Sequence, residues 1–211
     1  MKKVVFASII LISSLLCDCK QNRGQVYLDK YLHNDSVAQL LLVEYLSGSD
    51  AVAGFYIKED GKWLLLEEGP VFVGKNGLGK EKEGDMKTPI GEFTVATAFG
   101  ILPNPGTALP YIDATPSIYG CDDDPRYYNT IIDTAVVHHE CHGEHLMDYV
   151  PHYHYGMTIS YNEEQVMGLG SCIFVHCKGP NPYTAGCVAL DESFMRTVLV
   201  HADSRIRVCI Y

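Results

Sequence analysis

Short apolar runs separated by turn-forming residues dominate the chain from residue 37 onward. Residues 38–46 form one such run, and residues 51–57 and 62–67 form two more around the Lys-Glu-Asp-Gly segment at 58–61. Gly and Asp between two apolar runs are typical of a β-hairpin turn. We therefore predict a hairpin here, and further strands at 70–74, 92–98, 155–161, 172–177 and 205–211.

Only one segment has convincing helical periodicity. Apolar residues between 194 and 199 recur at the spacing that puts them on one face of a helix. Asp191 precedes them at a position where its side chain can cap the first turn. The pattern predicts a helix over 191–201 and a fold class that is mostly β with very little helix.

The N-terminal segment has a different pattern. Lys2 and Lys3 precede an apolar run over 4–16, which is the arrangement of a secretory signal and is shorter than a spanning helix needs. Cys17 and Cys19 follow the run, so a lipid anchor at Cys17 or Cys19 is an alternative to plain secretion, and an uncleaved anchor is a third. Each alternative exports the protein to the periplasm or cell envelope. We assign 1–19 to a signal peptide or lipoprotein signal, 20–36 to a short polar tether and 37–211 to one globular domain.

Charge and cysteine content narrow the function classes. The formal net charge of −10 argues against a nucleic-acid partner and against binding to an anionic membrane surface. Six of the eight cysteines lie in the globular domain, where export would permit disulfides. The sequence assigns neither their pairing nor an oligomeric state.

The clearest candidate chemistry lies between residues 171 and 190. An apolar run ends in His176, and eleven residues later Cys187 follows a Thr-Ala-Gly turn. Two strands joined by the Pro/Gly-rich loop would bring together a thiol nucleophile and its general base. The Cys177 carbonyl is the nearest group that could fix the imidazole tautomer, and backbone N–H groups around Gly186 and Cys187 could bind an oxyanion. For an arbitrary pair, a buried structural cysteine and a strand-end histidine would be the commoner explanation.

Several other short motifs follow one another in a characteristic order. They are Gly-Lys-Asn-Gly at 74–77, Glu-Gly-Asp at 83–85, Thr-Pro-Ile-Gly-Glu-Phe at 88–93, Phe-Gly at 99–100, Pro-Tyr at 110–111, Asp-Asp-Pro at 123–125, Tyr-Tyr-Asn at 127–129, Tyr-Asn at 161–162, Gly-Ser-Cys-Ile-Phe-Val-His at 170–176 and Thr-Ala-Gly-Cys-Val-Ala-Leu at 184–190. Together they resemble the YkuD-type L,D-transpeptidase catalytic domain over about residues 38–211. The resemblance implies a β-sandwich-like fold with one C-terminal helix and long active-site loops.

The resemblance also implies a reaction. Cys187 matches the family's nucleophile and His176 its proton donor and acceptor, and the family acts on the stem peptides of bacterial peptidoglycan. The expected chemistry is acyl transfer through a Cys187 thioester, either to an amine (L,D-transpeptidation) or to water (L,D-carboxypeptidase trimming). No cofactor and no metal is expected. Ala185 and Ala189 depart from the pattern, because many members have His and Arg or Asn there.

Further residues are weaker candidates for contacts in such a site. Glu144 suits an ammonium group on the stem peptide, and Tyr128 and Asn129 would present an aromatic face and an amide to a sugar-peptide. Thr184 is a fourth candidate for substrate binding.

Histidines concentrate in one segment that supports a competing hypothesis. Six of the nine lie between 138 and 154, namely His138, His139, His142, His145, His152 and His154. With Cys141 among them, His139, Cys141 and His145 could hold zinc with an open position, giving a metal-dependent peptidase that uses the loop from His138 to His145. The His-Glu-x-x-His order of a helical zinc protease is missing from the segment, so a polar loop rimming the cleft is the simpler explanation. An inactive wall-binding module is the third hypothesis.

Overall fold

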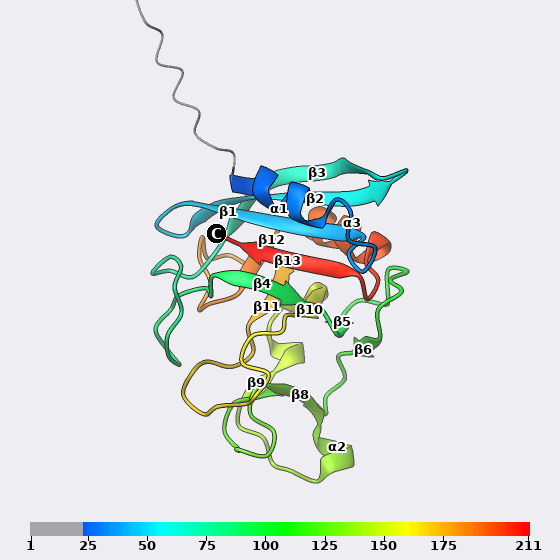
Figure 1. Cartoon of the computed structure of the whole chain (residues 1–211). Coiled ribbons are helices and arrows are strands. Elements are labelled where there is room, and N and C mark those ends of the chain that lie inside the picture. Colours follow the sequence, from blue (N-terminus) through cyan, green and yellow to red (C-terminus); the bar gives the residue numbers. More distant parts are fainter. Residues whose placement is uncertain (1–22) are drawn as a thin grey trace, which may run out of the picture.

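The computed structural model describes residues 23–211, so the predicted signal at 1–19, including Cys17 and Cys19, lies outside the described residues. Ten strands form one mixed sheet in the order β4-β13-β1-β2-β3-β12-β11-β10-β5-β6 (Figure 1). They are β1 (Gln39–Ser47), β2 (Asp50–Glu59), β3 (Lys62–Phe72), β4 (Gly91–Thr94), β5 (Ala98–Gly100), β6 (Tyr111–Asp113), β10 (Gly156–Thr158), β11 (Phe174–Cys177), β12 (Val188–Leu190) and β13 (Ile206–Ile210).

A smaller sheet lies at the opposite end of the molecule from the N-terminal helix (Figure 1). Its order is β8-β7-β9, with β7 (Ile118–Cys121), β8 (Thr130–Asp133) and β9 (Glu144–His145). The helices are α1 (Arg23–Tyr31), α2 (Thr134–Val137) and α3 (Glu192–His201), with 3₁₀ turns η1 (Leu146–Asp148) and η2 (His152–His154). The predicted mostly β class is confirmed. In residues 23–211 no helix has the length and apolar character needed to cross a membrane.

The predicted hairpin is confirmed as β2 and β3. Lys58 pairs with Trp63 and Glu59 with Lys62, which leaves Asp60 and Gly61 as the turn. Both turn residues have positive φ, 49° and 73°. A two-residue turn with positive φ at both central residues has a twist that matches the twist of the flanking strands. Asp-Gly is a favoured pair in such a turn.

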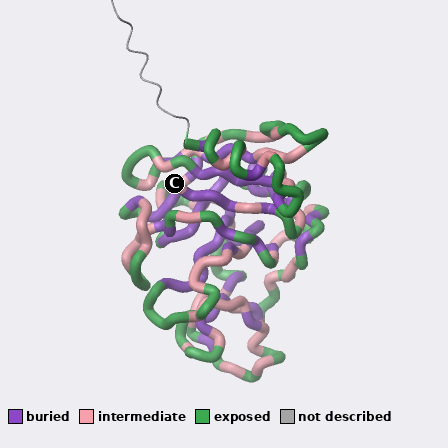
Figure 2. The backbone as a smooth tube through the Cα atoms, in the orientation of Figure 1, coloured by how far each residue is buried: buried purple, intermediate pink, exposed green. Residues whose placement is uncertain are grey.

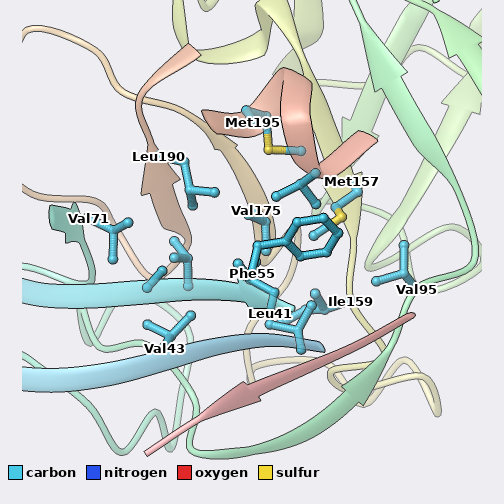
Figure 3. Packing of buried hydrophobic residues seen from close by; sticks show 14 of the residues in the cluster. Leu41, Val43, Phe55, Val71, Val95, Met157, Ile159, Val175, Leu190 and Met195 are labelled. Atoms are coloured by element: carbon cyan, nitrogen blue, oxygen red, sulfur yellow. The ribbon is translucent and has the colours of Figure 1, made fainter. Parts of the chain in front are cut away.

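The main core lies between the curled sheet and α3. Leu41 of β1 and Phe55 of β2 meet Val175 of β11, Leu190 of β12 and Met195 of α3 (Figure 3). All five side chains are fully buried. Figure 2 shows that burial is concentrated in the strands of the large sheet and that the connecting loops carry most of the exposed positions. The loops are therefore held on a rigid scaffold.

The helix α1 corrects the predicted tether, because residues 23–31 are helical and pack on the sheet. Tyr31, with Tyr27 and Leu28, contacts Leu40 and Leu42 on the face of β1 that points away from the main core. β1 is therefore buried on both faces, which explains why its sequence is a continuous apolar run and does not alternate.

The predicted C-terminal helix is confirmed, but its predicted cap is wrong. Asp191 occupies the N-cap position of α3 without a side-chain hydrogen bond to the first turn. Its carboxylate instead lies 3.1 Å from Lys178 Nζ. The ion pair draws the side chain away from the helix amides.

Candidate active site

Strand pairing puts His176 and Cys187 on the same face of the sheet. β11 and β12 are parallel, with Val175 opposite Val188 and His176 opposite Ala189. Side chains alternate along a strand, and directly paired residues share a face. Val175 and Val188 point into the main core, so His176 and Ala189 point the other way. Cys187 immediately precedes β12 and lies on that second face.

His176 and Cys187 line one cavity of about 260 Å³. Ala185 and Ala189, the two residues that depart from the family pattern, also line it. Their methyl groups leave room where the usual family members place larger polar side chains. A cavity of about 310 Å³ elsewhere is lined by Thr158 and its neighbours and includes neither His176 nor Cys187.

His176 has a defined tautomer. Its Nδ1 lies 2.7 Å from the Cys177 carbonyl, the contact expected from the sequence. A carbonyl only accepts hydrogen bonds, so Nδ1 carries the proton and Nε2 is left as the base. Burial, opposed by the hydrogen bond to the Cys177 carbonyl and aided slightly by nearby His152, lowers the pKa of His176 to about 4. The imidazole is therefore neutral at pH 7.

Cys187 is a buried, protonated thiol. Its Sγ donates to the Cys172 carbonyl at 3.3 Å and accepts the N–H of Phe174 at 3.3 Å. Burial and the nearby Glu144 carboxyl raise the pKa of Cys187 to about 12, and the Phe174 N–H opposes them. The cavity is therefore lined by a neutral thiol and a neutral imidazole and not by a thiolate–imidazolium pair.

Two threonines fix the turn that carries the nucleophile. Thr184 Oγ1 donates to the Cys187 carbonyl at 2.7 Å, and Thr88 Oγ1 donates to the same carbonyl at 3.1 Å. Thr184 Oγ1 also accepts the Gly186 N–H at 3.1 Å. These bonds use the hydroxyl proton of Thr184 and the amide proton of Gly186 within the turn, so neither proton is available to an oxyanion.

Gly186 is required by close packing. A Cβ at this position would lie 2.9 Å from Ile173 Cδ1 and 3.0 Å from the Lys87 carbonyl oxygen, and the residue has a φ of 156°. The second contact is with backbone, which cannot move aside cheaply. Gly186 thus lets the nucleophile turn lie against the 87–88 loop.

Tyr128 and Asn129 lie behind the site and do not line the cavity of Cys187. Tyr128 donates to Glu83 Oε2 at 2.6 Å. Asn129 Oδ1 accepts the Cys172 N–H at 2.9 Å. The Cys172 carbonyl accepts the hydrogen bond of the Cys187 thiol. Tyr128 and Asn129 therefore stabilise the segment that holds this thiol.

Glu144 reaches the cavity from the smaller sheet. It pairs with Gly120 of β7, and its carboxylate accepts a hydrogen bond from the buried Tyr153 hydroxyl. Burial raises the pKa of Glu144 to about 7, although the Tyr153 hydrogen bond lowers it. Of the four weaker substrate candidates, Glu144 and Thr184 line the cavity.

A buried ion pair supports the nucleophile loop, and sequence reasoning assigned it no role. Lys80 Nζ lies 3.0 Å from Asp85 Oδ1, and the two side chains are 1% and 8% exposed. Asp85 also accepts the N–H groups of Glu81, Lys82 and Lys87. Burial alone would raise the pKa of Asp85, but these N–H groups and Lys80 bring it well below its usual range. The sequence feature that could have pointed to this ion pair is the Glu-Gly-Asp motif at 83–85.

The structure does not bring together the three ligands of the competing metal hypothesis, His139, Cys141 and His145. His139 and Cys141 lie together, but their neighbours are Cys121 and Asp123. His145 instead stacks on Tyr119 with ring centroids 4.7 Å apart. Its Nδ1 lies 3.1 Å from Asp148 Oδ1. The open zinc site of a peptidase is not formed by these residues.

Comparison with known proteins agrees with the motifs and the fold. The sequence profile of the YkuD family, described as the L,D-transpeptidase catalytic domain, matches residues 52–208. The chain belongs to this family. Its predicted YkuD-like β fold is thereby confirmed, and Cys187 and His176 fall inside the matched range. No curated protein sequence matches the chain significantly.

The chain also has a distant similarity to several solved structures. The helical cell shape determining protein Pgp2 (K307A mutant) from Campylobacter jejuni has 20% identity and a TM-score of 0.47 over 83% of this chain and 47% of that one. An L,D-transpeptidase from Stackebrandtia nassauensis has 11% identity and a TM-score of 0.39 over 82% and 55%. The Enterococcus faecium L,D-transpeptidase C442S mutant has 12% identity and a TM-score of 0.40 over 82% and 50%. The chain spans about half the length of these matched structures.

Proposed function

We propose that the protein is an exported cysteine acyltransferase that acts on peptidoglycan stem peptides in the cell envelope. The observation that carries the proposal is the shared cavity of Cys187 and His176, in which the Cys177 carbonyl leaves His176 Nε2 as a base. The reaction is transfer of a stem-peptide acyl group, to an amine in L,D-transpeptidation or to water in L,D-carboxypeptidase trimming.

The proposed first step forms a thioester. Substrate binding turns the Cys187 S–H from the Cys172 carbonyl toward His176 Nε2, which takes the proton as sulfur attacks the carbonyl carbon of an L,D bond. The Phe174 N–H, which already donates to Sγ, stabilises the developing thiolate. The C–N bond then breaks, and the terminal D-residue leaves as an amine with the proton from His176.

The second step regenerates the thiol. Water or the amine of a second stem peptide gives a proton to His176 Nε2 and attacks the thioester carbonyl. The C–S bond breaks, and Cys187 recovers its proton from the imidazolium. Glu144 faces this same cavity, where its carboxylate would pair with an ammonium group of a stem peptide.

Product analysis with purified muropeptides tests the proposal. We expect the wild-type protein to remove the terminal D-alanine from tetrapeptide stems, with a cross-linked dimer if an amine is the acceptor and a tripeptide monomer if water is. Cys187→Ala should abolish both products, and His176→Asn should reduce turnover by about 10²–10⁴-fold through loss of the base.

Cys209→Ser is the matched control, because Cys209 is a buried cysteine of β13 that packs in the α1 cluster away from the cavity. It should retain activity. An unchanged muropeptide profile with folded wild-type protein, or full activity in Cys187→Ala, would refute the assignment.

A further inference from the structure

Two thiols, a carboxylate and an imidazole converge in the smaller sheet, outside the cavity of Cys187. They belong to Cys121 at the end of β7, Asp123, and His139 and Cys141 beyond α2. One ligand atom from each lies within 4.8 Å of all the others. We propose that these four residues form a structural zinc site.

The separations suit a four-coordinate zinc ion. Asp123 Oδ1 lies 3.0 Å from Cys121 Sγ and 3.3 Å from His139 Nε2. Cys121 Sγ lies 3.9 Å from His139 Nε2. With zinc–sulfur bonds of about 2.3 Å and zinc–nitrogen or zinc–oxygen bonds of about 2.0–2.2 Å, the edges of a tetrahedral site measure about 3.3–3.8 Å. Small side-chain rotations therefore bring the four atoms to coordination distance.

Outer contacts already orient two of the ligands. His139 directs Nε2 to the cluster, while its Nδ1 lies 3.8 Å from Asp124 Oδ2. Asp123 uses Oδ2 to accept the His142 N–H at 2.7 Å, which leaves Oδ1 for an ion. A carboxylate behind a ligating histidine and a hydrogen bond to a ligating carboxylate are the usual supports of a metal site.

The two cysteine sulfur atoms are buried, but polar groups lie next to them. Cys121 is 0% exposed and Cys141 is 7% exposed, with Ile132 packed against both. Cys141 Sγ accepts the Gly143 N–H at 3.3 Å. The site is thus enclosed on the sulfur side and reached from solvent on the side of the imidazole and carboxylate.

The donor set selects zinc and a structural role. Two thiolates and an imidazole favour zinc over magnesium or calcium, which take oxygen ligands. Four protein ligands fill a tetrahedral sphere and leave no position for a substrate or an activated water. Binding releases the two thiol protons to solvent and involves no electron transfer.

The zinc ion would fix the path of the backbone that leads to Glu144 at the cavity of Cys187. It joins the end of β7 to the segment after α2, and three residues beyond Cys141 the chain pairs with β7 and presents Glu144. A Cβ on Gly143 would lie 2.3 Å from the Gly120 carbonyl oxygen, so the backbones already touch between the two sites.

Zinc content of the full-length chain tests the site. After incubation with zinc sulfate and desalting, we expect about one zinc per chain, and almost none in His139→Gln or Cys141→Ser. Zinc should also raise the Tm of the wild-type protein and leave that of His139→Gln unchanged. Asp123→Asn, a conservative change at the 24%-exposed carboxylate, should weaken zinc binding by about 10–100-fold and keeps the test valid if a cysteine variant fails to fold.

His138→Gln and Cys209→Ser are the matched controls, because each replaces the same residue type outside the cluster. Both should retain one zinc. A metal-free protein whose non-reduced digest links Cys121 to Cys141 would show a disulfide in place of the ion and overturn the proposal. Free thiols that bind no zinc, or zinc retained by all the cluster variants, would overturn it too.

Discussion

The reaction proposed at Cys187 would begin from an uncharged pair, a thiol and an imidazole. The thiol has a pKa of about 12 and the imidazole one of about 4, both because of burial. Many cysteine enzymes keep a thiolate ready through a nearby cation. In the proposed mechanism the proton instead moves to His176 as sulfur attacks, so reactivity would depend on the substrate that brings the two groups into line.

The protonated resting thiol predicts slow alkylation of Cys187. The rate with iodoacetamide should rise about tenfold per pH unit from pH 7 to 9 without a plateau, because the thiolate fraction is still growing far below a pKa of 12. Peptide mass spectrometry at timed quenches measures the rate at this residue.

Free glutathione serves as the reference, since an ordinary thiol begins to plateau near its pKa of about 8.5. A rate at Cys187 that is already constant between pH 6 and 8 would mean a preformed thiolate.

At the level of elements, α1 was the segment that the sequence described least well. Its apolar residues are few, and its composition suits a solvated tether. Nothing local indicates that Tyr27, Leu28 and Tyr31 have a partner, because that partner is the outer face of β1. The hairpin and α3 were predictable from the sequence. The turn residues of the hairpin and the apolar face of the helix lie within the segments themselves.

Removing the α1 contact should destabilise the fold. Tyr31→Ala deletes a ring that is 9% exposed, and we expect a loss of about 3 kcal/mol in the free energy of unfolding. Urea denaturation followed by circular dichroism measures it.

Val26→Ala is the control on the same helix, because Val26 is 49% exposed and alanine has the higher helix propensity. Its stability should stay within about 0.5 kcal/mol of the wild-type value. Equal losses in the two variants would mean that α1 does not dock through Tyr31.

For the whole molecule, the active site depends on contacts between distant parts of the chain. The motif order made Cys187 and His176 candidates, and proximity in sequence suggested the Cys177 carbonyl, because all three lie within one strand–loop–strand unit. The position of Glu144 depends on the pairing of β9 with β7, which is set by tertiary structure and has no local signature. For the same reason, the sequence suggested His145 as a partner of His139 and missed Cys121 and Asp123.

Two buried groups should give the molecule opposite responses to acid. Burial depresses the pKa of His176 from 6.5 to about 4, so its contribution to stability is lost as pH falls through this range. Burial raises the pKa of Glu144 from 4.5 to about 7, so its contribution grows over the same fall in pH. In the wild-type protein the two effects offset each other.

In Glu144→Gln, the loss of stability that His176 causes as the pH falls should become measurable. Between pH 7 and 4.5 the free energy of unfolding of the variant should fall by about 3 kcal/mol more than that of the wild-type protein, since 2.5 pKa units correspond to about 3.4 kcal/mol. Urea titrations at several pH values measure the difference. Glu164→Gln, at an exposed position, is the control, and parallel pH profiles for wild type and Glu144→Gln would contradict the offset.

The place of β13 in the large sheet has a consequence for how the chain acquires its structure in the cell. β1 pairs with β2 on one side and with β13 on the other, and Gln39 of β1 lies opposite Ile206 of β13, so a central strand waits for a partner that is synthesised much later. Contacts between such distant segments slow folding, and the ribosome adds only about 5–20 residues per second. One edge of β1 therefore stays without its partner strand until β13 has been synthesised, and the large sheet is completed only then.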